Sequence, residues 1–231
     1  MIISALSLVG CGGGDAGTTT TSTTSGTDTP TDTSLVFSIF APEYFDGNFS
    51  VSYSLAGSDS NGDSYTATQS IDSGAVSKYL FKDVKEIIVS TSITNTVTSA
   101  PLDILDKKYF TYGANNSDIR LYASENLLGF SAIAQTDYVI PLTATIGDAG
   151  TIGEYFRAND SSSFTQSWEL TDGFNGKAKL IVTTVPSDTT PSGLYPTTVE
   201  KLLISQDGTV SGYELIITDH QNSNTITLTS L

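Results

Sequence analysis

The most regular set of potential metal ligands lies in one short turn. Asp59, Asn61 and Asp63 alternate in the segment GSDSNGDSY. Oxygen ligands at alternate positions of a tight loop suit Ca²⁺, and this spacing opens the EF-hand loop. Ser64 stands where that loop needs glycine, however, and Ser70 stands where it needs a bidentate glutamate. We therefore expect a polar hairpin turn, with a weak Ca²⁺ site as the alternative.

Other catalytic chemistries lack their required residues. His220 is the only histidine, and no Gly-x-Ser-x-Gly elbow accompanies it, so a Ser-His-Asp triad is not expected. A zinc site needs three or four His, Cys or acidic ligands, of which only the acids are plentiful. We place His220 in the last hairpin turn and expect no cofactor and no catalytic residues.

Two further residue types could act on glycans. Glu154, Glu169 and Glu214 fall in or near predicted strands, and glycoside hydrolysis requires two facing carboxylates. Strand glutamates on a polar face are usually only solvated. Trp168, in a Ser-Trp-Glu strand, is either a core residue or a platform on which a sugar stacks. We keep it as a weak candidate for ligand binding.

The only cysteine occupies a position that explains it. Cys11 ends the run Leu-Val-Gly-Cys after a short apolar stretch, which resembles the bacterial lipobox. That resemblance implies cleavage before Cys11 and its acylation, and several acyl chains hold a protein stably on a membrane. Residues 1–10 are then a remnant of a signal peptide. Gly12 stands where a signal for inner-membrane retention would place aspartate, which favours the outer membrane.

The composition restricts the partners. Ten basic residues against 25 acidic ones give a net charge of −15, and no basic patch is visible in the sequence. Such a surface repels nucleic acid and disfavours anionic membranes. A protein or a neutral glycan remains possible as a partner, alongside the membrane reached through the lipid on Cys11.

The chain divides by composition into a tether and a folded domain. Residues 12–34 are rich in Gly, Thr and Ser and contain no apolar side chain larger than alanine, so no core can form there. We therefore assign residues 11–34 to an acylated cysteine and a disordered tether. The folded domain is expected over residues 35–231, beginning at the apolar run that starts with Leu35.

The folded domain is predicted to be mainly β. Apolar residues alternate with polar ones in several runs, such as residues 49–55, 138–146 and 213–217, and Asn-Gly or Asp-Gly pairs stand between runs. Strands joined by such short turns must pair antiparallel. We expect an antiparallel β-sandwich or a flattened barrel, in which residues 49–55 and 213–217 face each other.

Helix and repeats are secondary features of this prediction. At most two short helices are expected, one over residues 101–110 and one turn over residues 123–128. The segments FSVSYSL (49–55) and FTQSWEL (164–170) are each followed by an Asn-Gly turn. They suggest two related halves with a seam near residues 145–153, or two unrelated hairpins built from similar residues.

One stretch of the chain resembles a known group of proteins. The sequence IPLTATIGDAGT (140–151), followed by SWEL (167–170) and NGKA (175–178), is similar to uncharacterised proteobacterial lipoproteins. These carry a Gly-Asp-x-Gly-Thr turn before a Trp-bearing strand. The resemblance implies a β-rich domain in the cell envelope, and no activity accompanies it.

We expect a lipid-anchored envelope protein whose non-catalytic β-domain binds, adheres or scaffolds. One alternative is a periplasmic carrier of a lipid or another hydrophobic ligand, and another is a glycan-active envelope enzyme. A large apolar cavity favours the carrier and two close acids in an open cleft favour the enzyme, whereas a filled domain favours the binding module.

Overall fold

The computed structural model describes residues 28–99, 101–113, 118–126, 131–187 and 195–231. Across these ranges the regular structure is β-strand, and the strands are β1 to β14. Among the residues that the structure describes, there is no α-helix, and thus no helix long and apolar enough to cross a membrane.

Two runs of consecutive strands build the wall of the molecule. The first run comprises β2 (Ser50–Asp59), β3 (Ser64–Tyr79), β4 (Lys82–Asn95), β5 (Pro101–Thr111), β6 (Arg120–Asn126) and β7 (Ser131–Asp137). The second run comprises β9 (Ala149–Arg157), β10 (Ser162–Asp172), β11 (Ala178–Pro186), β12 (Thr197–Ile204), β13 (Val210–Asp219) and β14 (Asn224–Ser230). Each strand pairs antiparallel with the next one in its run.

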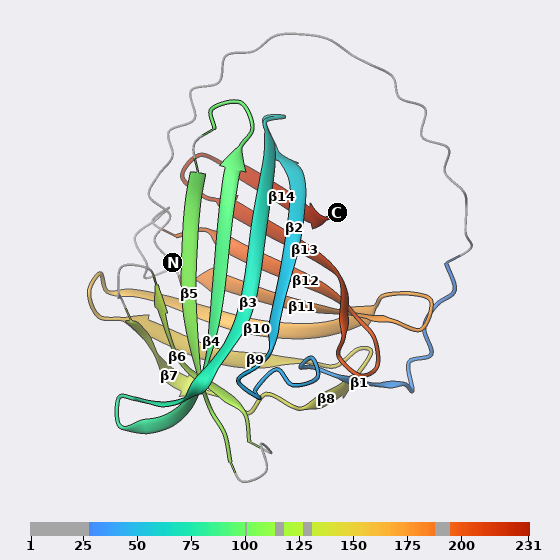
Figure 1. Ribbon diagram of the computed structural model, residues 1–231, viewed down its shortest axis with the longest axis vertical. Coiled ribbons are helices and arrows are strands. Elements are labelled where there is room, and N and C mark those ends of the chain that lie inside the picture. The colour runs from blue at the N-terminus through green and yellow to red at the C-terminus, as the bar shows by residue number, and fades with distance from the viewer. Residues whose placement is uncertain (1–27, 100, 114–117, 127–130, 188–194) are drawn as a thin grey trace.

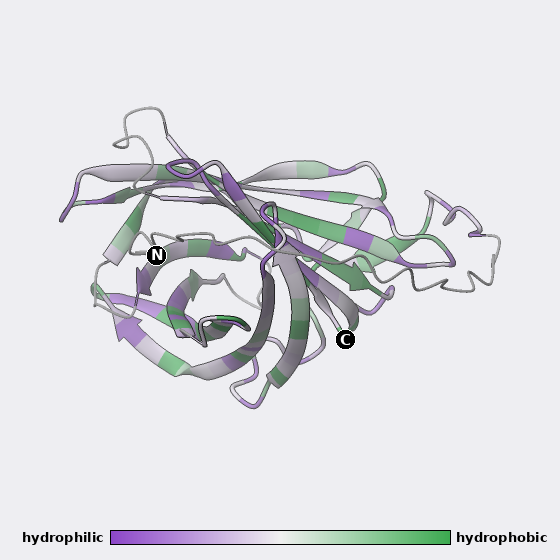
Figure 2. Cartoon of the chain, turned by 90° about the horizontal axis from the view of Figure 1, so that it is seen from above, coloured by the Kyte–Doolittle hydropathy of each residue, from purple (hydrophilic) through white to green (hydrophobic). Residues whose placement is uncertain are grey.

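The two runs join at both edges and close into one barrel. Strand β7 pairs antiparallel with β9, and β14 pairs antiparallel with β2. Figure 1 shows β2 to β5 upright in front, with β10 to β14 crossing behind them at a steep angle. Figure 2, seen from above, shows apolar and hydrophilic residues interspersed along the strands. Closure leaves no barrel strand with an unpaired edge.

A small second sheet packs at one end of the barrel. Strands β1 (Val36–Ser38) and β8 (Thr143–Thr145) pair antiparallel, and both lie low in Figure 1. Phe37 on β1 and Ala144 on β8 are buried, and both belong to the main core together with Ile87 of β4 and Leu170 of β10. The segment that follows β1 adds a group of rings in tilted or edge-to-face contact at this end: Phe40, Tyr44, Phe45 and Phe49 with Phe110.

The prediction of an antiparallel all-β domain is confirmed, and the barrel rather than the sandwich is the form it takes. The expected meeting of residues 49–55 with residues 213–217 also occurs. The rings of Tyr53 and Tyr213 stack with centroids 5.2 Å apart, and Leu55 packs with Leu215 and Ile217 in a second core cluster.

Two helix predictions were wrong. Residues 101–110 form most of β5, and the described part of 123–128 belongs to β6. In β5, charged Asp106 and Lys108 occupy the same face as Ile104 and Phe110, which interrupts the apolar alternation. The apolar residues that remain fit a helical spacing as well as a strand, so the sequence pattern is ambiguous.

The strand expected over residues 138–146 is mostly a connection. Only Thr143–Thr145 form a strand, while Tyr138 and Leu142 are 42% and 41% exposed. Ile140 is buried and forms an isolated bridge with Ile119. This segment crosses between the two runs of strands, and its buried side chains, Ile140 and Ala144, are four residues apart.

The C-terminal end of the predicted tether contacts the barrel. Thr31 is 5% exposed, donates its backbone N–H to Asp172 Oδ1 at 3.1 Å, and donates its hydroxyl to the Lys177 carbonyl at 2.8 Å. Asn175 donates its backbone N–H to the Thr29 carbonyl at 2.8 Å. Residues 29–34 therefore lie on the barrel, before the expected boundary at Leu35. Residues 11–27 lie outside the described residues.

The topology divides the chain into two similar halves, but the two similar sequence segments do not occupy equivalent strands of these halves. Each half has one short strand, β1 or β8, followed by six consecutive barrel strands. The segment 49–55 lies largely in β2, the first barrel strand of its half. The segment 164–170 lies in β10, the second barrel strand of its half. Their likeness is that of two hairpins, each with an Asn-Gly turn.

Barrel closure gives a first prediction. A Cβ added at Gly57 would lie 1.8 Å from the backbone oxygen of Thr227, across the β14–β2 pair. Gly57→Ala should therefore lower the free energy of unfolding by about 3 kcal/mol, measured by urea denaturation. Gly212→Ala is the control, because its Cβ would meet Leu203 Cβ at 3.4 Å, an ordinary contact. Equal stability of the two variants would contradict the closure at this seam.

Candidate functional site

The barrel encloses an apolar cavity near the end covered by β1 and β8. Its volume is about 120 Å³, enough for several water molecules or a small organic group. Both runs of strands and the segment after β1 contribute to its wall. The side chains around it include Phe40, Tyr44, Val51, Val89, Trp168, Leu180, Val182 and Leu202. We call it the inner cavity.

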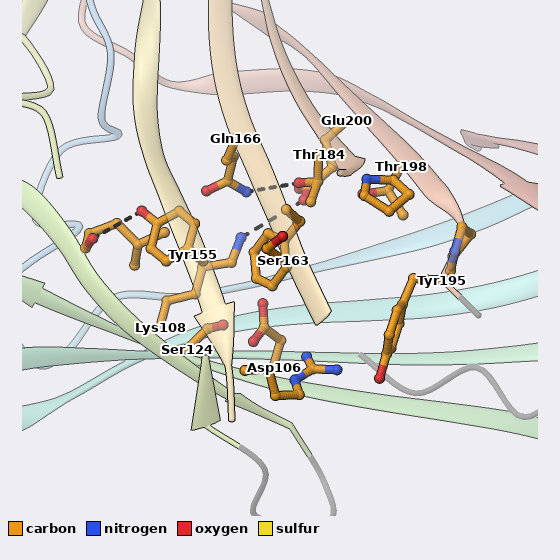
Figure 3. Close-up of a pocket in the computed structure, with 15 residues that line it drawn as sticks. Asp106, Lys108, Ser124, Tyr155, Ser163, Gln166, Thr184, Tyr195, Thr198 and Glu200 are labelled. Carbon is orange, nitrogen blue, oxygen red and sulfur yellow. Dashed lines mark hydrogen bonds and ion pairs between the residues drawn. The ribbon is translucent and has the colours of Figure 1, made fainter. Parts of the chain in front are cut away.

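A second, more polar cavity adjoins the first. Its volume is about 110 Å³, and Figure 3 shows polar side chains from β5, β9, β10, β11 and β12 around it. They include Asp106, Lys108, Arg157, Ser163, Thr184, Tyr195, Thr198 and Glu200. We call it the outer cavity.

Four residues belong to the walls of both cavities: Lys108, Leu121, Gln166 and Glu200. They come from four strands, so the shared wall depends on closure of the barrel. Lys108 Nζ lies 3.8 Å from Glu200 Oε1, and Gln166 donates its amide N–H to Thr184 Oγ1 at 3.0 Å. These bonded side chains separate an apolar chamber from a polar one, which is the arrangement that an amphipathic small molecule would match.

Lys108 is held in its charged form by two acids. Burial alone would lower the pKa of Lys108, but the carboxylates of Glu200 and Asp106 outweigh burial and raise it. Burial raises the pKa of Asp106, with partial compensation by Lys108. Glu200 also accepts a hydrogen bond from the Tyr213 hydroxyl at 3.0 Å. The junction therefore contains one cation with two acids, one of which resists ionisation.

A second ion pair lines the outer cavity. Arg157 is 3% exposed, and its Nη1 lies 3.8 Å from Asp160 Oδ2. Asp160 also accepts hydrogen bonds from the Ser162 backbone and from the Tyr195 hydroxyl. These bonds outweigh burial and lower the pKa of Asp160. The Tyr195 ring covers the Arg157 guanidinium, with its centroid 5.0 Å from Cζ. Asp160 thus balances the charge of Arg157, although the buried Nε and Nη1 of Arg157 make no hydrogen bond.

The residues of the weak Ca²⁺ candidate are used in a different way. Asp59 Oδ1 accepts the backbone N–H groups of Asn61 and Asp63, each at 2.9 Å. Its Oδ2 accepts from the Tyr65 hydroxyl at 3.2 Å and from Asn224 Nδ2 at 2.9 Å. Asp59 is 6% exposed, so its carboxylate fixes the β2–β3 turn to β14 from within the protein. Within the described ranges, no three His, Cys, Asp or Glu side chains cluster as metal ligands.

Trp168 lies in the wall of the inner cavity. It is 7% exposed on β10, so it is not a platform on the outer surface. Gly150 on β9 makes room for it, because a Cβ there would approach the indole Nε1 to 2.8 Å. Trp168 is therefore both a core residue and a residue that a ligand in the cavity would touch.

The other candidates are scattered over the surface. His220 lies in the turn between β13 and β14, as expected, and its Nε2 is 2.8 Å from Thr197 Oγ1. Glu154 and Glu169 are exposed on β9 and β10, and Glu214 pairs with Lys201 at 3.1 Å. The acids that the fold does bring together are Asp106 and Glu200. Cys11 lies outside the described residues.

Comparisons with known proteins add little to this picture. No protein-family model and no curated protein sequence matches the chain. Among solved structures, a candidate lipoprotein from Parabacteroides distasonis aligns over 84% of this chain and 97% of that chain. The sequence identity is 12% and the TM-score is 0.31, which is too low to show a shared family. The resemblance to proteobacterial lipoproteins therefore stays a prediction.

Asp106 and Lys108 were missed by sequence reasoning. Both lie in the segment that was predicted to be a helix, where charges two residues apart would point in different directions. No period-two signal marks them, because Asp106, Lys107 and Lys108 are three consecutive charged residues. Two charges at inward positions of a barrel strand are a mark of a polar interior site.

The half-buried Asp106 gives a second prediction. Because desolvation raises its pKa, the stability that Asp106 contributes is fully present below the ordinary value of 3.8 and is lost as the pH rises through the raised pKa. Asp106→Asn should therefore raise the free energy of unfolding at neutral pH by about 1 kcal/mol, and by less in acid. Urea denaturation across pH measures this. Asp103→Asn, on an exposed residue of the same strand, should show no such gain.

Proposed function

We propose that this chain is a lipid-anchored protein of the cell envelope whose closed barrel binds a small neutral amphipathic molecule and does no chemistry on it. The observation that carries the proposal is the pair of adjoining cavities with a shared wall at Lys108, Leu121, Gln166 and Glu200. The apolar part of the ligand would occupy the inner cavity. Its polar end would meet the hydrogen-bonding side chains of the outer cavity.

The charges of the wall favour a neutral ligand. Lys108 is paired with Glu200, and Arg157 is paired with Asp160. Burial disfavours ionisation of Asp106. A charged ligand would lose its hydration without gaining an uncompensated opposite charge, which costs free energy in a buried site. Neutral polar groups, in contrast, can exchange hydrogen bonds with Gln166, Thr184 and Thr198.

The same features argue for binding over catalysis. Asp106 and Glu200 both line the outer cavity, and the Lys108 ammonium group interacts with both, so these acids are not a free carboxylate pair. Trp168 gives no support to adhesion through an exposed aromatic platform, because it lies in the wall of the inner cavity.

Ligand binding can be tested with short-chain probes that differ only in the charge of their polar end. Hexanol should change the fluorescence of Trp168, the only tryptophan, and raise the melting temperature, whereas hexanoate and hexylamine should bind about tenfold more weakly. Val182→Phe should fill the inner cavity and abolish the response to hexanol. Ile181→Phe, on the opposite face of β11, is the matched control.

Two results would reject this proposal. Absence of any response to hexanol up to its solubility limit would show that the cavities do not admit such a ligand. An identical response in the Val182→Phe variant would place the binding elsewhere.

Anchoring is tested separately. Cys11 in its lipobox-like context should be acylated, and Gly12 favours transport to the outer membrane. Cells given a clickable palmitate analogue should label the protein, the label should be lost in Cys11→Ala, and the labelled protein should fractionate with the outer membrane. Equal labelling of both forms would contradict the acylation, and recovery in the inner membrane would contradict the location only.

A further inference from the structure

The hairpin between β3 and β4 ends in an unusual turn. Tyr79 pairs with Lys82, which leaves Leu80 and Phe81 as a two-residue loop. The side chain of Phe81 is 99% exposed and that of Leu80 is 47% exposed. Figure 1 shows this end of the hairpin extending beyond the barrel at the lower left. Two large apolar side chains thus occupy the outermost point of a long hairpin.

The backbone of this turn suits other residues better. Leu80 has φ 45° and Phe81 has φ 69°, in the left-handed region. Two-residue hairpin loops with positive φ at both positions strongly prefer Asn-Gly. Bulky apolar residues are strained there, and such strain persists where function requires the side chains. Leu80 and Phe81 thus occupy the tip although their side chains disfavour a positive φ.

The charge of the tip differs from that of the whole chain. Residues 76–85 carry Lys78, Lys82 and Lys85 against Asp83, a charge of +2, whereas the whole chain carries −15. Lys78 is paired with Asp83 at 3.3 Å, but both are exposed, so the pair is weak. Lys82 lies 4.2 Å from the ring centroid of Tyr122. Lys85 donates to the Phe45 carbonyl at 2.9 Å, which leaves Lys78 and Lys82 beside the apolar tip of a chain that is acidic overall.

From this geometry we infer that the β3–β4 tip inserts into the surface of a bilayer that contains anionic lipids. Leu80 and Phe81 would enter the boundary between headgroups and acyl chains, while Lys78 and Lys82 would contact the lipid phosphates. Two side chains at a point are too small for a stable protein interface, which needs roughly 800 Å² on each partner. The inference does not depend on the ligand in the barrel.

Behind the tip the hairpin is rigid enough to hold it in place. The rings of Tyr79 and Tyr109 stack with centroids 3.9 Å apart, and the Tyr79 hydroxyl is 2.5 Å from Ser131 Oγ. Val84, just after the tip, is fully buried against Tyr109 and Ala123. The exposed apolar residues therefore project from a packed base.

The test uses the full chain with Cys11→Ala, so that no acyl chain contributes to membrane binding. Sedimentation with vesicles of phosphatidylglycerol and phosphatidylethanolamine should recover the protein, and vesicles of phosphatidylcholine alone should recover about tenfold less. Leu80→Asn with Phe81→Gly should abolish recovery while raising the melting temperature, because the new pair suits the turn. A merely structural role for the tip would give the opposite change in melting temperature.

Two further variants separate charge from apolar insertion. Lys78→Gln with Lys82→Gln should remove the preference for phosphatidylglycerol. Val97→Ser changes a side chain that is 76% exposed in the turn between β4 and β5, and it should leave recovery unchanged. Equal recovery of the parent and the Asn-Gly variant, or no recovery of the parent with either vesicle, would overturn the inference.

Discussion

Closure of the barrel is the constraint on which the rest of this structure depends. Antiparallel strands leave unpaired N–H and C=O groups at the two edges of a sheet, and a sheet of this size would expose two long edges. Pairing of β7 with β9 and of β14 with β2 removes both. At one seam the backbones approach so closely that Gly57 has no room for a side chain. The interior cavities exist only because both seams are made.

The interior is not a uniform apolar core. One end is filled by aromatic rings from the segment after β1, and another part is filled by a cluster around Leu55 and Leu228. Between the filled regions lie the two cavities, with Lys108 and Glu200 at their junction. A charged pair inside a barrel costs desolvation, and removing either partner would leave the other charge uncompensated.

The surface shows a similar separation of roles. Most turns are polar and acidic, as the Asp59 to Asp63 turn illustrates, and their carboxylates bind backbone N–H groups of the same turn. The β3–β4 turn is apolar, basic and strained at Leu80 and Phe81. Turns of the first kind are explained by folding alone. The β3–β4 turn is not, because a different residue pair would fold more easily there.

The sequence by itself determined the class of the fold, its antiparallel pairing and several of its turns. Alternation of period two and Asn-Gly or Asp-Gly pairs are local properties, so residues 49–55 and 213–217 were read correctly. Only the tertiary structure decided that the sheet closes, since closure depends on contacts between β2 and β14, which lie far apart in the chain. The same holds for the site: Asp106, Lys108 and Glu200 meet through barrel geometry, and inward charges on β5 concealed the strand that carries two of them.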